Sequence, residues 1–99
     1  MQENGSPRRR ERRNPTPTNA EEDRKVQRAL LALILREHPT QMTFPDLARE
    51  LFDDPDDFLA GDALARAVRD LAAIGLLQSN GLFVLPTRAA LHFHVLMFD

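Results

Sequence analysis

Histidines and a run of aspartates are the side chains that most readily suggest chemistry in this chain. His92 and His94 share a side only on a strand, because on a helix they lie about 200° apart. The run Asp53–Asp57 has the composition of a calcium loop, but its spacing does not fit. Counting from Asp53, the sixth residue is Phe58 and the twelfth is Leu64, where an EF-hand requires Gly and Glu. We therefore predict no metal site.

Nucleophiles in a catalytic arrangement are not evident either. The serines are Ser6 and Ser79, neither lies in a Gly-x-Ser-x-Gly motif, and the chain has no cysteine. Phosphate-binding and dinucleotide-binding loops are also missing from the sequence. We therefore predict that the protein is not an enzyme, that it has no catalytic residues or cofactor, and that it binds no small-molecule substrate.

The hydrophobic pattern gives no sign of a membrane protein. The longest apolar run, Ala29–Leu35, is far shorter than the roughly 20 residues that span a bilayer. The basic cluster near the N-terminus is followed by the polar, acidic segment 14–23, where a signal peptide would need an apolar core. These patterns predict no membrane association and a cytoplasmic location.

Charge is distributed unevenly along the 99 residues. The first 20 residues contain five arginines against Glu3 and Glu11, whereas the remainder has eight basic and thirteen acidic residues. The arginines are Arg8, Arg9, Arg10, Arg12 and Arg13. Since residues 1–18 contain three prolines and no large apolar residue except Met1, we expect residues 1–19 to be a disordered basic arm and residues 20–99 to be one domain. The arm is either a solubilising tail or a phosphate-binding segment.

Apolar spacing predicts a first helix that begins near Ala20 and ends at His38, before Pro39. A capping box at Thr18–Glu21 supports that start. The main apolar stripe consists of Val26, Leu30, Leu33 and Ile34. Leu31 and Leu35 lie on another side, so the helix is either covered on two sides within the chain or contacts a second copy.

A short second helix is predicted after Thr43, with Pro45 in its first turn and Asp46 at the N3 position. The acidic connection that follows is expected to be a turn starting at Pro55 and capped by Asp54. Phe58 and Leu59 are expected to pack into the core, with a break and a new cap at Gly61–Asp62.

A third helix follows, with Leu64, Val68 and Leu71 as its apolar stripe and Gly75 at its end. Its opposite stripe carries Asp62, Arg66, Arg69, Asp70 and Ala73. The dipeptide Asn80–Gly81 then separates two short apolar runs, which predicts a β-hairpin with a type I′ turn.

The order helix, Gly, strand, Asn-Gly, strand resembles the third helix and wing of MarR-like and ArsR-like winged helix-turn-helix regulators. The resemblance implies a mainly α fold with a small β-hairpin (α+β): a three-helix core, a two-stranded wing and a C-terminal helix. It also implies a transcriptional regulator that binds double-stranded DNA. Arg66 and Arg69 would contact base edges or phosphates, while Asn80 and the five arginines of the arm would hold the backbone.

An alternative function is open, because winged helices also serve as protein-interaction modules. The long acidic connection before the third helix departs from the family pattern, and an acidic domain repels DNA unless its charges are segregated. The alternative is therefore a module for dimerisation or partner binding that does not contact DNA.

The last segment, 87–98, fits either a helix capped by Thr87 or an alternating strand. The resemblance favours the helix, which would bury Ala90, Leu91, Val95 and Phe98. Because its apolar residues exceed what one face of a small domain can cover, we predict a homodimer. The predicted interface consists of Leu31, Leu35, Phe93, Leu96 and Met97.

Overall fold

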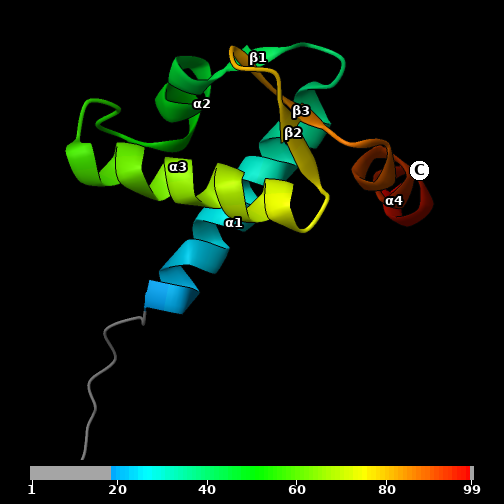
Figure 1. Cartoon of the computed structure of the whole chain (residues 1–99), viewed down its shortest axis with the longest axis horizontal. Helices are drawn as coiled ribbons and strands as arrows, with labels where there is room; N and C mark the ends of the chain where they lie inside the picture. Colours follow the sequence, from blue (N-terminus) through cyan, green and yellow to red (C-terminus); the bar gives the residue numbers. More distant parts are fainter. Residues whose placement is uncertain (1–18, 99) are drawn as a thin grey trace, which may run out of the picture.

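The computed structural model describes residues 19–98, which form four helices and three strands (Figure 1). In chain order these are α1 (Asn19–Glu37), β1 (Met42–Thr43), α2 (Phe44–Leu51), α3 (Phe58–Ala73), β2 (Leu77–Ser79), β3 (Phe83–Pro86) and α4 (Arg88–Phe98). The expected arm and the Thr18 cap lie outside the described residues. The expectation of a mainly helical α+β fold is confirmed.

The core lies where α1 and α3 pack against α2 and the sheet. From α1 it takes Leu30, Leu33 and Ile34, all buried, with Val26 partly buried beside them. From α3 it takes Leu64 and Leu71 from the expected stripe, together with Ala67. Leu47 and Ala48 of α2, Leu77 of β2 and Val84 of β3 complete it. The expected apolar stripes of both long helices therefore do face the core.

Helix α2 starts as its sequence predicts. The Thr43 hydroxyl accepts a hydrogen bond from the Asp46 N–H at 3.2 Å, and the Asp46 carboxylate accepts one from the Thr43 N–H at 3.0 Å. This reciprocal pair satisfies two backbone donors at the helix start. Pro45 lies in the first turn, where its missing N–H costs little.

Helix α3 starts earlier than predicted. Asp57 is its N-cap, with the Leu59 N–H donating to the Asp57 carboxylate at 3.1 Å, so Gly61 lies inside the helix and the expected break at Gly61–Asp62 is wrong. Phe58 and Leu59 are 82% and 72% exposed, so their expected burial is also wrong. At about 100° per residue both lie at least about 120° around the helix from Leu64, and therefore point away from the core.

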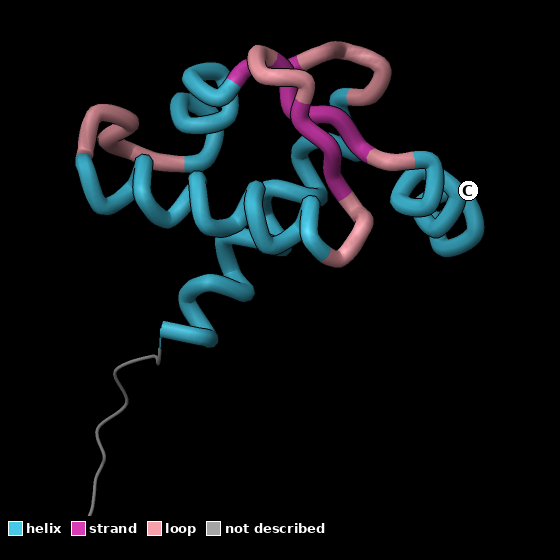
Figure 2. The backbone as a smooth tube through the Cα atoms, viewed as in Figure 1, coloured by secondary structure: helices cyan, strands magenta, loops and turns pink. Residues whose placement is uncertain are grey.

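Three antiparallel strands form the sheet, in the order β1-β3-β2. Met42 pairs with Val84 and Thr43 with Phe83, while Ser79 pairs with Val84 from the other side. The two predicted strands are present, but the sheet is not two-stranded, because β1 adds a third. A strand of two residues carries no alternation, so the hydrophobic pattern could not reveal it. Figure 2 shows α4 on the other side of this sheet from α2.

The β2–β3 hairpin forms as predicted, but its turn is one residue later. The Asn80 N–H donates to the Phe83 carbonyl at 3.2 Å, which leaves Gly81 and Leu82 as the two central residues. Gly81 has φ of 95°, a backbone conformation that favours glycine. The Asn80 carboxamide oxygen accepts hydrogen bonds from the N–H groups of Leu82 and Phe83, at 3.2 and 2.9 Å. Asn80 therefore closes the loop with its side chain and is not a central residue of a type I′ turn.

Segment 88–98 is helical, as preferred from the sequence, and Thr87 caps it by accepting from the Ala90 N–H at 3.2 Å. The Thr87 hydroxyl also donates to the Gly75 carbonyl at 2.7 Å, which ties the start of α4 to the end of α3. Ala90 is buried as expected, but Val95 and Phe98 are exposed. Their expected burial is wrong because nothing in the described part of the chain covers that end of α4.

Candidate interaction surfaces

Arg66 was predicted to contact DNA, and it lies between two carboxylates. Its guanidinium donates to Asp62 at 2.6 Å, one turn earlier on α3, and to Asp23 of α1 at 3.2 Å. The hydrogen bond to Asp23, opposed by partial desolvation and aided by the charges of Asp23 and Asp62, raises the pKa of Arg66. Because both carboxylates neutralise this cation, Arg66 would have to break its ion pairs before it could bind a phosphate.

The predicted outer stripe of α3 does not face solvent along its whole length, because part of it faces α1. Asp70 accepts a hydrogen bond from Gln27 of α1 at 3.5 Å, so Asp70, like Arg66, faces α1. The residues of α3 that are exposed beyond its first turn are Asp62, Ala65, Arg69, Ala72 and Ala73. This face presents mainly methyl groups with one acidic and one basic side chain, which is a poor match for a polyanion.

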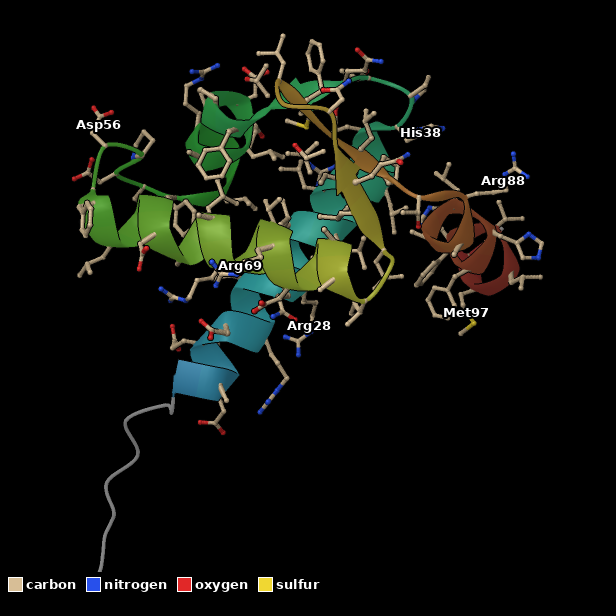
Figure 3. All side chains as sticks on the ribbon, in the orientation of Figure 1. Arg28, His38, Asp56, Arg69, Arg88 and Met97 are labelled. Atoms are coloured by element: carbon tan, nitrogen blue, oxygen red, sulfur yellow. The ribbon has the colours of Figure 1, made fainter. Side chains whose placement is uncertain are left out.

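Arg69 keeps an exposed side chain, and its ion pair with neighbouring Asp70 is long, at 3.9 Å. Figure 3 shows Arg69 on α3 and Arg28 on α1. Arg28 and Arg24 are exposed and form no ion pair within residues 19–98. Asn80, also predicted to contact DNA, uses its carboxamide oxygen inside the hairpin loop. The arginines of the arm lie outside the described residues.

The connection between α2 and α3 is acidic and exposed. Asp53, Asp54, Asp56 and Asp57 all lie on the surface. Because this connection leads directly into α3, its four carboxylates oppose the binding of phosphates at the start of that helix. Across residues 19–98 the chain holds eight basic and twelve acidic side chains.

Helix α4 carries the largest group of exposed apolar side chains in the described residues. Phe93, Leu96 and Met97, predicted for a dimer interface, are exposed, and so are Val95 and Phe98; their exposed fractions range from 50% to 71%. Leu31 and Leu35, also predicted for the interface, are half-buried on α1, which packs against α4. Large apolar side chains exposed in such number on one short helix are typical of interaction sites.

The histidines of α4 do not come together on one side. His94 is half-buried with its ring 5.2 Å from that of Phe98, and its Nδ1 has no hydrogen-bond partner, while His92 is exposed. Among residues 19–98 no group of three or more His, Asp or Glu side chains is placed to hold a metal ion.

Two surface hollows have volumes of about 170 and 230 Å³. The first lies between α1 and the end of α2 and is lined by Lys25, Val26, Ala29, Leu51 and Phe52. Both volumes are below the roughly 300–1,000 Å³ of pockets that enclose a small molecule. Within the part of the chain that the structure describes, no helix is both long and apolar enough to cross a bilayer.

Comparison of this chain with protein-family models, with curated proteins and with solved structures gives no match. Its function is therefore inferred from the surfaces of α3 and α4 and from the acidic connection between α2 and α3.

Proposed function

We propose that this chain is a winged-helix protein-interaction module that forms a homodimer through α4. Support for the winged-helix part comes from the element order, in which α2 and α3 follow one another and lead into the β2–β3 hairpin. The strand β1, which pairs with β3, fits the same arrangement. Because the fold alone does not decide the function, the proposal depends on the surfaces.

The observation that carries the proposal is the exposed face of α4. From Ala89 to Phe98 the helix contains no Asp, Glu, Lys or Arg, so a second α4 meets no like charge. A stable dimer buries about 800 Å² on each partner, which is more than one short helix offers. We infer that Leu31 and Leu35, which are half-buried on the α1 helix that packs against α4, add to the interface, and that a two-fold axis lies beside α4.

Sedimentation equilibrium of the full chain at micromolar concentration tests the dimer. We expect about twice the monomer mass of 11.2 kDa. The variant Phe93→Ser with Leu96→Ser should sediment as a monomer while keeping its helical circular dichroism. Leu82→Ser removes an exposed apolar side chain from the hairpin instead, and should remain dimeric. A monomeric parent chain, or a double variant that stays dimeric, would contradict the proposal.

DNA binding is a second candidate function, favoured by the exposed arginines on α1 and α3. Arg69, Arg24 and Arg28 are available for phosphates, and the arm Arg8–Arg13 precedes α1 in the chain. If the protein binds DNA, Arg69 and the arm supply the phosphate contacts, and Arg66 does not. We place it second because of the paired Arg66 and the acidic connection before α3.

Fluorescence anisotropy with generic duplex DNA across a salt series tests this candidate. Affinity should fall as salt rises, because phosphate contacts release counterions. Arg69→Gln should weaken binding, whereas Arg66→Gln should not weaken it beyond its effect on folding. No binding at low salt would remove the candidate, and binding that survives Arg69→Gln but not deletion of residues 1–18 would assign it to the arm alone.

A further inference from the structure

The connection between α2 and α3 has an apolar pair at each end. The segment Leu51–Leu59 reads LFDDPDDFL, so that Leu51–Phe52 precede the aspartates and Phe58–Leu59 follow them. The first pair packs against the core. The second pair is exposed on the first turn of α3, at the opposite end of the molecule from Met97 of α4, as the position of neighbouring Asp56 in Figure 3 shows.

Hydrogen bonds hold this exposed pair in place. The Asp54 carbonyl accepts from the Asp57 N–H at 3.1 Å, and the Asp54 carboxylate accepts from the Asp56 N–H at 3.2 Å. Asp57 then caps α3 directly before Phe58. A rigid aromatic side chain loses little conformational entropy when it is covered, and such residues act as anchors in protein interfaces.

The charges around the pair define what can cover it. The carboxylates of Asp53 and Asp56 are exposed and form no ion pair or hydrogen bond within the described residues. Asp62, one turn into α3, is also exposed, but its carboxylate already accepts from Arg66 at 2.6 Å and is not part of this free acidic surface. An acidic rim around an aromatic and an aliphatic side chain is complementary to apolar residues flanked by Lys or Arg.

Three segments of this chain do not have that chemistry. The arm has the arginines but no large apolar residue other than Met1. Helix α4 has the apolar residues, but between Ala89 and Phe98 it has no Lys or Arg. Helix α1 has exposed Arg24, Lys25 and Arg28, but the large apolar side chains between and beside them, Val26 and Leu30, face the core. The surface therefore fits another protein better than it fits a second copy.

We propose that Phe58 and Leu59, with the acidic rim of Asp53 and Asp56, form a docking site for a segment of another protein in which apolar side chains are flanked by Lys or Arg. The site is separate from the α4 surface and does not depend on dimerisation. A dimer would present it twice.

Nuclear magnetic resonance of the isotope-labelled full chain tests the site with three designed peptides. The first is an amphipathic helix of Lys and Leu, the second replaces every Lys by Glu, and the third replaces every Leu by Ser. The Lys–Leu peptide should bind saturably and shift the amide signals of residues 53–62. The Glu–Leu and Lys–Ser peptides should not, because each lacks one half of the complementarity.

Variants locate the binding. Phe58→Ser with Leu59→Ser, and separately Asp53→Asn with Asp56→Asn, should each weaken the Lys–Leu peptide about tenfold, as loss of an interface anchor does. Leu82→Ser is the matched control and should bind as the parent does. Because all of these side chains are exposed, the variants should keep the parent's circular dichroism. Equal binding of the Lys–Ser peptide, shifts confined to α4, or unchanged affinity in both double variants would overturn the proposal.

Discussion

Arg66 of α3 donates to Asp23 of α1 at 3.2 Å, across 43 positions of sequence. One turn further along both helices, Gln27 donates to Asp70 at 3.5 Å, again across 43 positions. The two links advance by four residues on each helix in the same sense, so α1 and α3 run in the same general direction where they meet. Polar side chains thus line the border of the apolar contact between the two helices.

We expect Arg66→Gln to lower the free energy of unfolding, because it removes the cation shared by Asp23 and Asp62. Urea denaturation should show a larger loss than for Arg69→Gln, whose side chain is more exposed and pairs only at 3.9 Å. The loss should shrink at high salt, which screens ion pairs at the surface. In a double-mutant cycle with Asp23→Asn, a coupling of zero would mean that this ion pair does not contribute to stability, which would contradict the prediction.

Two glycine substitutions should act in opposite directions. Gly61 lies inside α3 with open space at its Cβ position, so Gly61→Ala should stabilise the fold by about 0.5–1 kcal/mol. Gly81 also has open space but a φ of 95°, so Gly81→Ala should destabilise by about 1–2 kcal/mol through backbone strain alone. Chemical denaturation measures both. If Gly61→Ala destabilised the fold instead, that result would support the helix break at Gly61–Asp62 that the sequence predicts.

The capping box of α2 should make the stability of the fold depend on pH in the acidic range. The Thr43 N–H, with a smaller contribution from the Thr43 hydroxyl, lowers the pKa of Asp46 below its ordinary value of 3.8. A lowered pKa means that the folded chain favours the carboxylate, so this stabilisation is complete above the unfolded value and is lost as the pH falls through the folded value.

Asp46→Asn should therefore be less stable than the parent chain by a constant amount above about pH 5. The difference should disappear as the pH falls below 3.8, the ordinary value of the carboxylate. Urea denaturation across this range measures it. A difference that persists in acid would show that the carboxylate charge is not what stabilises the helix start.

Leu64 is fully buried at the centre of the core, and Leu64→Ala should destabilise by about 2–5 kcal/mol because it leaves a cavity. Leu82→Ala removes the same atoms from an exposed hairpin position, and should change the free energy of unfolding by no more than about 0.5 kcal/mol. Similar losses in the two variants would place Leu82 in an interface and not in solvent.

Features that depend on neighbouring residues could be predicted from the sequence. The caps at Thr43 and Thr87, the apolar stripes of α1 and α3, and the presence of a hairpin all follow from residues within one or two turns of each other. The turn of the hairpin lies one residue later than the pattern predicts, because the Asn80 side chain replaces a backbone carbonyl as the acceptor. This side-chain hydrogen bond is also local. The sequence did not indicate it because Asn-Gly strongly favours a type I′ turn with Asn and Gly as the central residues.

Features that depend on packing could not be predicted. Asp23 and Arg66 meet only once α1 and α3 are assembled, so the sequence pattern places Arg66 on the outer stripe of α3 and does not reveal its partner on α1. Phe58 and Leu59 have the composition of core residues, and only the start of α3 at Asp57 turns them outward. The sequence shows that α4 has more apolar residues than one face can cover, but which of them stay exposed depends on what α1 covers.

The sheet order β1-β3-β2 leaves only short outer strands, of two and three residues. Such short edge strands offer a neighbouring molecule too few unpaired backbone N–H and C=O groups to add a stable strand. Short edges therefore protect the protein against edge-to-edge aggregation. The dimer proposed above would therefore have to form through helix side chains, so that substitutions on α4 would change its stoichiometry and leave the backbone ladder untouched.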